Sequence, residues 1–162
     1  MHVTFAPRGI LQIDDARITF RNFSGIGSKF NREGDRSFAL VIDNQEIADA
    51  LLADTNEFGA AWNVKIRHQD EDTPFMYMNV KVKFNGRGPA IYLKTGDVMN
   101  KLDESNVSML DKIDIASVDL DIRPYDDEFN GRGFRSAYLQ SMCVTQDLLT
   151  DRFANRFRSE EY

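Results

Sequence analysis

The sequence predicts a mainly β protein with one or two short helices, folded as a small antiparallel barrel. Apolar and polar side chains alternate with a period of two through most of the 162 residues. Turn sequences that contain glycine and asparagine, such as the two copies of "NGRG", separate the alternating segments. Because six or seven short strands would leave exposed edges in an open sheet, a closed or partly closed barrel is expected, with an open sandwich as the alternative.

The first strand is predicted at 16–23, where Ile18 and Phe20 share one face. The opposite face of this strand then carries Arg17, Thr19, Arg21 and Phe23. A polar loop with glycines, 24–35, leads into a second strand at 36–43. These two strands are expected to form a hairpin.

A short amphipathic helix is predicted directly after this hairpin. In 43–54 the apolar side chains, among them Ile47 and Leu51, recur at helical spacing. Asp43 or Asn44 is available as the residue that caps the first turn.

The same alternation predicts the remaining strands, at 62–67, 75–84, 90–95, 116–125 and 134–145. In the first of them Trp62, Val64 and Ile66 face inward, so Trp62 is assigned to the core, while Lys65 and Arg67 face outward. In the second, the outward positions are Tyr77, Asn79, Lys81 and Lys83.

The chain is expected to form a single domain, 1–162. One or two helical turns are predicted within 102–113, and a short helix and tail begin at about 147. The longest apolar runs are a few residues, against the roughly 20 needed to cross a bilayer, and the amino terminus lacks a signal-peptide core. A cytoplasmic protein without a membrane partner is therefore expected.

Charge is distributed unevenly along the chain. The net charge is −6, but residues 17–38 hold five basic and two acidic side chains, a balance of +3 that leaves −9 for the rest. An acidic body with one basic surface repels a polyanion except at that surface, which orients its binding. The alternative is a chance cluster of charges on a hairpin.

Few side chains in the sequence are suited to catalysis. The two histidines, His2 and His68, lie at the terminus and in an acidic loop, and the spacings of zinc sites and catalytic triads are absent. The single cysteine, Cys143, lies on an alternating apolar pattern and is expected to be a buried, inert thiol. We expect no enzyme activity, no metal site and no cofactor.

The sequence also bears on other kinds of site. The "GIG" in 24–35 lies between two strands, not between a strand and a helix, which excludes a phosphate-binding loop. A metal-dependent nuclease stays open as a rival, with Asp119, Asp121 and Asp126 as its acids. A further possibility is a protein-interaction or virion-associated β domain that works through its acidic surface.

The outward faces of three predicted strands are basic and aromatic, with no acidic residue among them. If these strands are neighbours, their cations can neutralise phosphates and their rings can stack on bases of a single strand. The alternative is that they are ordinary solvent-facing residues. The candidate nucleic-acid-binding residues are Arg17, Arg21, Phe23, Lys29, Phe30, Arg32, Lys65, Arg67, Tyr77, Lys81 and Lys83.

Three segments carry a resemblance to a known family: "ARITFRNFSG", "KFNREGDRSFALVID" and "VDLDIRPYDDEFNGRGFRSAYLQSMCV". In their order and spacing they resemble the single-stranded DNA-binding proteins of tailed-phage replication modules, which have an OB-type barrel. The resemblance implies sequence-independent binding of single-stranded DNA, without a cofactor, in the replication or recombination of a phage within its bacterial host cell.

The resemblance also implies partners other than DNA. Replication or recombination proteins are expected to dock on an acidic tail that ends in an aromatic residue, to which Glu160, Glu161 and Tyr162 correspond here. This acidic part is short and follows three arginines, in which it departs from the family pattern. A monomer or a homodimer is expected.

Overall fold

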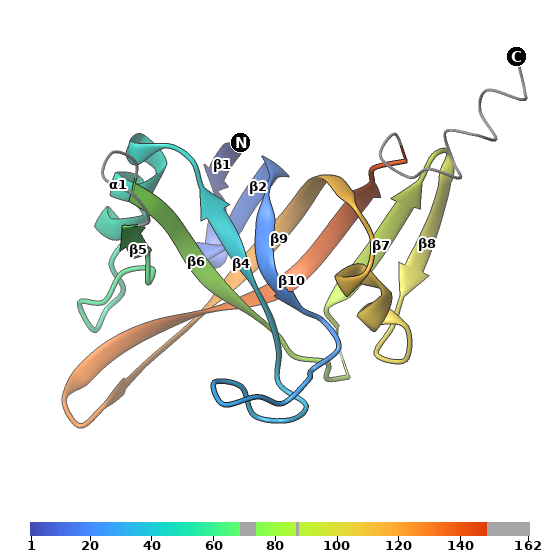
Figure 1. Ribbon diagram of the computed structural model, residues 1–162. Helices are drawn as coiled ribbons and strands as arrows, with labels where there is room; N and C mark the ends of the chain where they lie inside the picture. Colours follow the sequence, from blue (N-terminus) through green and yellow to red (C-terminus); the bar gives the residue numbers. More distant parts are fainter. Residues whose placement is uncertain (69–73, 87, 149–162) are drawn as a thin grey trace, which may run out of the picture.

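The computed structural model describes residues 1–68, 74–86 and 88–148. Their hydrogen-bonded strands form one strongly curved sheet, with one α-helix and two short 3-10 helices (Figure 1). The strands are β1 (His2–Phe5), β2 (Leu11–Ala16), β3 (Ile18–Asn22), β4 (Arg36–Ile42), β5 (Lys65–His68), β6 (Pro74–Val82), β7 (Ala90–Thr95), β8 (Val98–Leu102), β9 (Ile115–Phe129) and β10 (Arg132–Gln146). The helices are η1 (Pro7–Gly9), α1 (Gln45–Ala53) and η2 (Val107–Asp111).

The main path of the sheet runs β1-β2-β9-β10-β6-β4-β3, with β5 beside β6, and β7 between β10 and β8. The pairings are antiparallel except those of β10 with β6 and with β7, which are parallel. The prediction of a mainly β protein with one clear helix is confirmed. The described strands follow an open path, so the term barrel fits the curved sheet only loosely.

The longest element is the hairpin of β9 and β10, whose strands have 15 residues each. Asn130 and Gly131 connect them with positive φ angles of 51° and 77°, the backbone that a two-residue hairpin turn requires. The far end of this hairpin extends beyond the rest of the sheet (Figure 1). At the other end of the hairpin, β10 pairs with β7. Strand β10 therefore connects β7 and β8 to the rest of the sheet.

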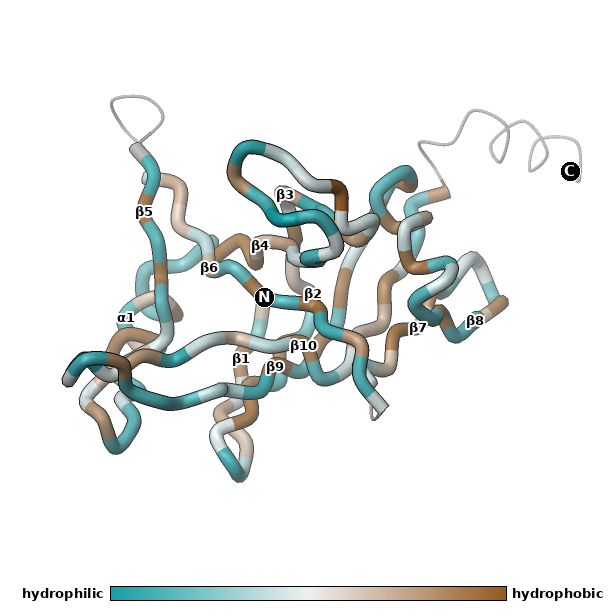
Figure 2. Tube along the Cα trace, turned by 90° about the horizontal axis from the view of Figure 1, so that it is seen from below, coloured by the Kyte–Doolittle hydropathy of each residue, from teal (hydrophilic) through white to brown (hydrophobic). Residues whose placement is uncertain are grey.

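The core lies on the inner face of the curved sheet. Buried side chains come from β2, β4 and β6 to β10, and from α1 and η2, and form one cluster, which includes Trp62, Phe38, Leu120 and Val144. Hydrophobic and hydrophilic positions alternate along the chain trace as expected for strands with one buried face (Figure 2). The assignment of Trp62 to the core is confirmed, since it is 1% exposed.

Helix α1 follows the sequence prediction closely. The Asn44 side chain caps it by accepting hydrogen bonds from the backbone nitrogens of Glu46 and Ile47, at 2.7 and 3.3 Å. Leu51 and Ala48 are buried against the sheet. The choice between Asp43 and Asn44 is thereby settled for Asn44.

Several predicted elements differ from those observed. The sequence patterns predicted no strands at β1, β2 and β8. The strand predicted at 62–67 begins only at Lys65. Ile66 shares the inner face with Met76, which lies opposite it, but it is 54% exposed instead of buried. This happens because β5 pairs only along the first residues of β6, at an edge where no second layer covers Ile66 among the described residues.

Two further expectations concern the helices and the tail. The helical turns expected within 102–113 correspond to η2. The helix expected from about 147 and the tail residues Glu160, Glu161 and Tyr162 lie outside the described residues. Within the described part of the chain, no helix has the length and apolar character of a membrane span.

The Asn44 cap gives a first testable prediction. Replacing Asn44 by Ala removes an acceptor for two backbone nitrogens of α1 and should lower the free energy of unfolding by about 1 kcal/mol. Urea denaturation followed by circular dichroism measures this change. Asn44→Asp keeps an oxygen acceptor and should stay close to the wild type; equal losses in both variants would contradict the capping role.

Candidate nucleic-acid interface

Strand β6 divides its side chains cleanly between two faces. Met76, Met78, Val80 and Val82 are buried in the core, as the alternation predicted for the two valines. The opposite, outer face carries Phe75, Tyr77, Asn79 and Lys81. Lys83 follows the end of the strand and is exposed.

The cross-strand register places other candidate residues beside Tyr77. Lys65 of β5 lies opposite Tyr77, and Arg67 lies opposite Phe75. On the other side of β6, Val41 of β4 lies opposite Tyr77, and its backbone nitrogen donates to the Arg17 carbonyl at 3.0 Å. Directly opposed residues share a face of a sheet. The predicted neighbourhood of these strands is therefore present, with Arg17, Lys65 and Arg67 all exposed.

A group of three rings lies on this same face. The Phe20 ring lies edge-on to Phe75 and Tyr77, with centroids 6.1 and 5.7 Å away, and Phe75 stacks on Tyr77 at 5.5 Å. The Arg67 guanidinium lies 5.6 Å from the Phe20 ring centroid. We call Phe20, Phe75 and Tyr77 the β6 aromatic cluster. Phe20 is 51% exposed, so much of its ring is open to a ligand.

Phe20 was expected to face inward, and a local backbone feature explains the difference. Its φ angle is +49°, and the pairing of β3 with β4 shifts register between Thr19 and Asn22. Such an irregularity changes the side to which later side chains point. Phe75, by contrast, could have been found from the alternation alone, because it lies two residues before Tyr77.

The same shift overturns the prediction for Phe23. It was placed on the outer face as a base-stacking residue, but it is fully buried and stacks on Phe38 with centroids 5.5 Å apart. Its backbone nitrogen donates to the Asp111 carboxylate at 2.8 Å. Phe23 is therefore a core residue.

Arg21 also has a different environment from the one predicted. Its guanidinium Nη1 donates to the carbonyls of Leu110 and Ile113, at 2.6 and 2.8 Å, and so ties β3 to η2. The side chain is held against the backbone of another segment instead of standing free beside Arg17. Arg21 therefore does not belong to the outer face of β6.

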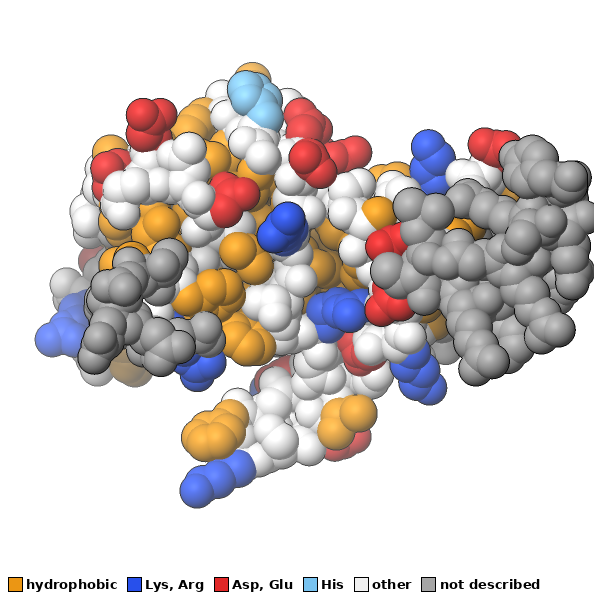
Figure 3. Space-filling model, turned by 45° about the horizontal axis from the view of Figure 1, so that its top comes forward, with side chains coloured by type: hydrophobic (Ala, Val, Ile, Leu, Met, Phe, Trp, Pro, Cys, Tyr) orange, Lys and Arg blue, Asp and Glu red, His pale blue; other side chains and the backbone are white. Residues whose placement is uncertain are grey.

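Lys29, Phe30 and Arg32 lie at the end of the loop between β3 and β4. This loop projects from the sheet (Figure 1), and it carries basic and hydrophobic side chains at its tip (Figure 3). Phe30 is 92% exposed, with the Lys29 ammonium 5.8 Å from its ring centroid. The base of the loop is fixed by a backbone hydrogen bond from Gly34 to Gly25 at 2.8 Å. The tip is thus accessible while its base is ordered.

The three acids of the nuclease alternative do not converge. Asp119 and Asp121 lie on the outer face of β9, whereas Asp126 is on the inner side, where the Arg135 guanidinium binds it through two hydrogen bonds at 2.8 and 3.1 Å. Asp119 accepts from the Asp15 nitrogen, and Asp121 accepts from the Ser141 hydroxyl. The described residues include no group of His, Cys, Asp and Glu suited to hold a metal ion.

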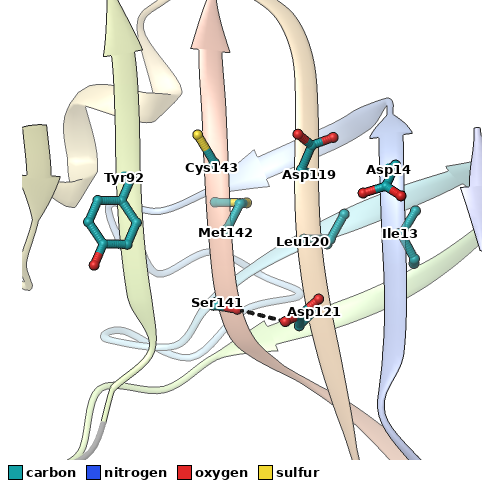
Figure 4. A pocket seen from close by; sticks show the side chains of 9 residues that line it. All are labelled: Ile13, Asp14, Tyr92, Asp119, Leu120, Asp121, Ser141, Met142 and Cys143. Atoms are coloured by element: carbon teal, nitrogen blue, oxygen red, sulfur yellow. Dashed lines mark hydrogen bonds between the residues drawn. The ribbon is translucent and has the colours of Figure 1, made fainter. Parts of the chain in front are cut away.

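The outer acids line a shallow hollow of about 270 Å³ together with Asp14, Tyr92 and Cys143 (Figure 4). Cys143 is partly buried here, less than the full burial that was expected. Burial raises the pKa of its thiol, and the nearby Asp119 carboxylate raises it further. The thiol is therefore a poor nucleophile, in line with the sequence interpretation.

Arg135 stabilises the part of the β9–β10 hairpin near the turn, from its inner side. In addition to Asp126, it donates to the Asp54 carbonyl and carboxylate at 2.9 and 3.2 Å, and it lies 4.9 Å from the Trp62 ring centroid. Hydrogen bonds from Arg135 and Asn56 hold the pKa of the Asp126 carboxyl below its usual range, although burial acts in the opposite direction.

Comparison with known proteins adds to this geometry. The family model of the phage ssDNA-binding domain matches residues 2–161. No curated protein matches the chain.

Three solved structures of the single-stranded DNA-binding protein from bacteriophage Enc34 have a similar fold. A C-terminal truncation of that protein gives a TM-score of 0.58 at 14% identity, covering 90% of each chain. A second structure gives 0.55 at 17% identity, covering 90% of this chain and 85% of the other. The structure in complex with ssDNA gives 0.54 at 16% identity, covering 90% of each chain.

The opposite environments of Phe20 and Phe23 can be tested by paired substitutions. Phe23→Ala removes a fully buried ring and should lower the free energy of unfolding by about 3–5 kcal/mol. Phe20→Ala removes a half-exposed ring and should cost much less. Urea denaturation of both variants measures the difference, and a larger loss for Phe20→Ala would contradict the observed register of β3.

The lowered pKa of Asp126 predicts a pH dependence of stability. A carboxyl whose pKa is lower in the folded state stabilises the fold above its unfolded pKa of about 3.9, and this contribution is lost as the pH falls through the folded pKa. Asp126→Asn should therefore flatten the loss of stability below about pH 4. Urea denaturation between about pH 2.5 and 7 tests this, with the exposed Asp43→Asn as the control. Parallel pH profiles for the wild type and Asp126→Asn would argue against it.

Proposed function

Because the chain belongs to the phage ssDNA-binding domain family, we propose that it binds single-stranded DNA on the outer face of β6 and its neighbouring strands, without sequence preference. The observation that carries this proposal is the β6 aromatic cluster, three partly exposed rings bordered by Arg17, Lys65 and Arg67. Rings and cations together are the elements of sequence-tolerant single-strand binding.

Each part of this face has a defined task. Phe20, Phe75 and Tyr77 offer ring faces and edges to unpaired bases, which stack on aromatic side chains whatever their identity. Arg17, Lys65, Arg67, Lys81 and Lys83 neutralise phosphates beside them. In a duplex the faces of the bases are already stacked on one another and cannot stack on protein rings. The three rings therefore favour binding of single-stranded DNA over duplex DNA.

The electrostatics of the molecule supports the same location. The residues that face outward on β5 and β6 include no carboxylate, whereas the chain as a whole carries a net charge of −6. A polyanion is repelled by the acidic body and attracted to this face, which restricts the ways in which DNA can approach. The loop tip with Lys29, Phe30 and Arg32 provides a second exposed contact of the same chemistry.

The similarity of the fold to the Enc34 protein in complex with ssDNA supports a DNA-binding role. Within this proposal the protein acts without catalysis and without a cofactor, in phage DNA replication or recombination in the cytoplasm of the host cell. Its functional unit is a monomer or a homodimer that forms one domain over 1–162. Replication or recombination proteins dock on Glu160, Glu161 and Tyr162, which lie outside the described residues.

The phosphate contacts can be tested by the salt dependence of binding. Lys65→Gln with Arg67→Gln should weaken the binding of a fluorescent oligothymidylate at least about tenfold in low salt. It should also reduce the slope of log K against log salt by about 1.4, since each phosphate neutralised on a single strand contributes about 0.7 to that slope. Fluorescence anisotropy at several salt concentrations, without metal, measures both quantities, with a matching duplex as the competing ligand.

The control for this experiment is Lys101→Gln, an exposed lysine on β8, away from the proposed face. It should leave affinity and slope unchanged. An unchanged slope for the Lys65 and Arg67 variant would exclude this face as the binding site, and failure of the wild type to bind at low salt would refute DNA binding itself.

The stacking contribution has its own test. Phe20→Ala should weaken oligothymidylate binding by about 5- to 150-fold, because stacking contributes roughly 1–3 kcal/mol per base. Phe5→Ala is a matched control, since Phe5 is 47% exposed on β1 and lies outside the aromatic cluster. Equal affinities for both variants in the same anisotropy titration would exclude Phe20 as a stacking residue.

A further inference from the structure

A second group of rings lies on the β9–β10 hairpin, where sequence reasoning singled out none. The Tyr125 ring centroid is 6.2 Å from that of Phe134 and 6.2 Å from that of Tyr138. All three side chains point to the outer face of the hairpin, because Tyr125 alternates with the inward Pro124 and Asp126 and pairs with Ser136. We call these residues the hairpin aromatic cluster. Tyr125 and Phe134 are 47% and 36% exposed.

Register connects this cluster to the outer face of β6. Tyr138 lies directly opposite Lys81 of β6 on one side and opposite Arg123 of β9 on the other. The Lys81 ammonium and the Arg123 guanidinium lie 5.5 and 4.9 Å from the Tyr138 ring centroid. Lys81, Tyr138 and Arg123 therefore form a row of cation, ring and cation. This row continues the outer face of β6 from Tyr77, which lies four residues before Lys81.

We propose that the hairpin aromatic cluster is a second base-stacking subsite for the same DNA strand. The proposal rests on the function proposed above, and it extends the footprint from β6, by way of Lys81 and Arg123, onto the hairpin. Its chemistry is that of the first cluster: partly exposed rings offer stacking surface, and adjacent cations hold the phosphates that flank the stacked bases. The ligand is an unpaired, sequence-independent segment of the bound strand.

The charge on the hairpin shows where this footprint ends. Beyond Tyr125, the same face carries Asp127, whose carboxylate accepts a hydrogen bond from the Tyr125 hydroxyl at 3.3 Å and raises the pKa of that hydroxyl. Asp127 lies opposite Phe134, so a phosphate is repelled at this edge of the cluster. The bound strand is thus expected to leave the subsite toward Tyr138 and not toward the hairpin turn.

The inner side of the hairpin is fixed in place. Arg135 attaches it to Asp54, and Asn56 donates to Asp126 and to the Phe134 carbonyl at 2.9 and 3.1 Å. A Cβ atom at Gly133 would meet Phe58 at 2.5 Å, so the close contact there requires glycine. Rings held in place before binding lose little conformational entropy when a base stacks on them.

The test is the length dependence of binding. Oligothymidylates of roughly 4 to 16 nucleotides, which span the site sizes of single-strand-binding barrels, are titrated by anisotropy with the full-length protein. The double variant Tyr125→Ala with Phe134→Ala should bind the shortest oligomers within about twofold of the wild type. For longer oligomers it should bind about 5- to 100-fold more weakly, with the difference appearing above a threshold length.

The control is Phe129→Ala, which removes a ring that is 72% exposed at the end of the hairpin and lies outside the cluster. It should match the wild type at every length. An equal loss at all lengths, or no loss at any length, overturns the second subsite while leaving the first cluster untouched. If instead neither the wild type nor Phe20→Ala binds any oligomer, the result refutes the proposed function itself.

Tyr138→Phe gives a second variant that does not depend on removing two rings at once. It keeps the ring between Lys81 and Arg123 and should preserve binding at every length. Tyr138→Ala should reproduce the length-dependent loss. Thermal unfolding of each variant confirms that it is folded, and a loss with Tyr138→Phe equal to that with Tyr138→Ala would contradict stacking as the mechanism.

Discussion

The pairing of β6 on both sides is the constraint on which the candidate interface depends. Along its length β4 lies on one side, and β5 and β10 lie in succession on the other. A strand held in this way cannot slip by one residue without moving Met78 and Val80 out of the core and Tyr77 and Lys81 into it. The burial of the inner face therefore fixes which residues reach the outer one.

This constraint explains which parts of the site could be predicted from the sequence. The alternation in β6 is regular, so Tyr77, Asn79 and Lys81 were placed correctly on one face, and the helix after β4 was recognised from its spacing and cap. Within β3, however, a single residue with positive φ exchanges the faces of Phe20 and Phe23. The residues around Phe20 are β-branched and aromatic, as in a regular strand, so the local sequence does not indicate the bulge.

Interactions between distant segments account for what the sequence patterns did not reveal. Arg21 looked like its neighbour Arg17 in the alternating pattern, but the carbonyls that bind it come from Leu110 and Ile113, 89 and 92 residues later. The connection of the hairpin aromatic cluster to β6 depends on the opposition of Tyr138 and Lys81 in a parallel pairing. No short-range pattern encodes such a register, because it follows from how the whole sheet curves.

Strand β10 also lies along the boundary between a basic and an acidic region of the outer surface. Its register against β9 shifts between Leu139 and Ser141. Before this shift the outer neighbours are Arg123 and Tyr125, and after it they are Asp121 and Asp119, which line the acidic hollow with Asp14. A polyanion that follows β6 toward β10 thus meets a cation at Arg123 of β9. Two and four residues earlier on β9 it meets the carboxylates of Asp121 and Asp119. Under the proposed function, the sheet that aligns the rings for a single strand of DNA therefore also limits how far that strand can extend.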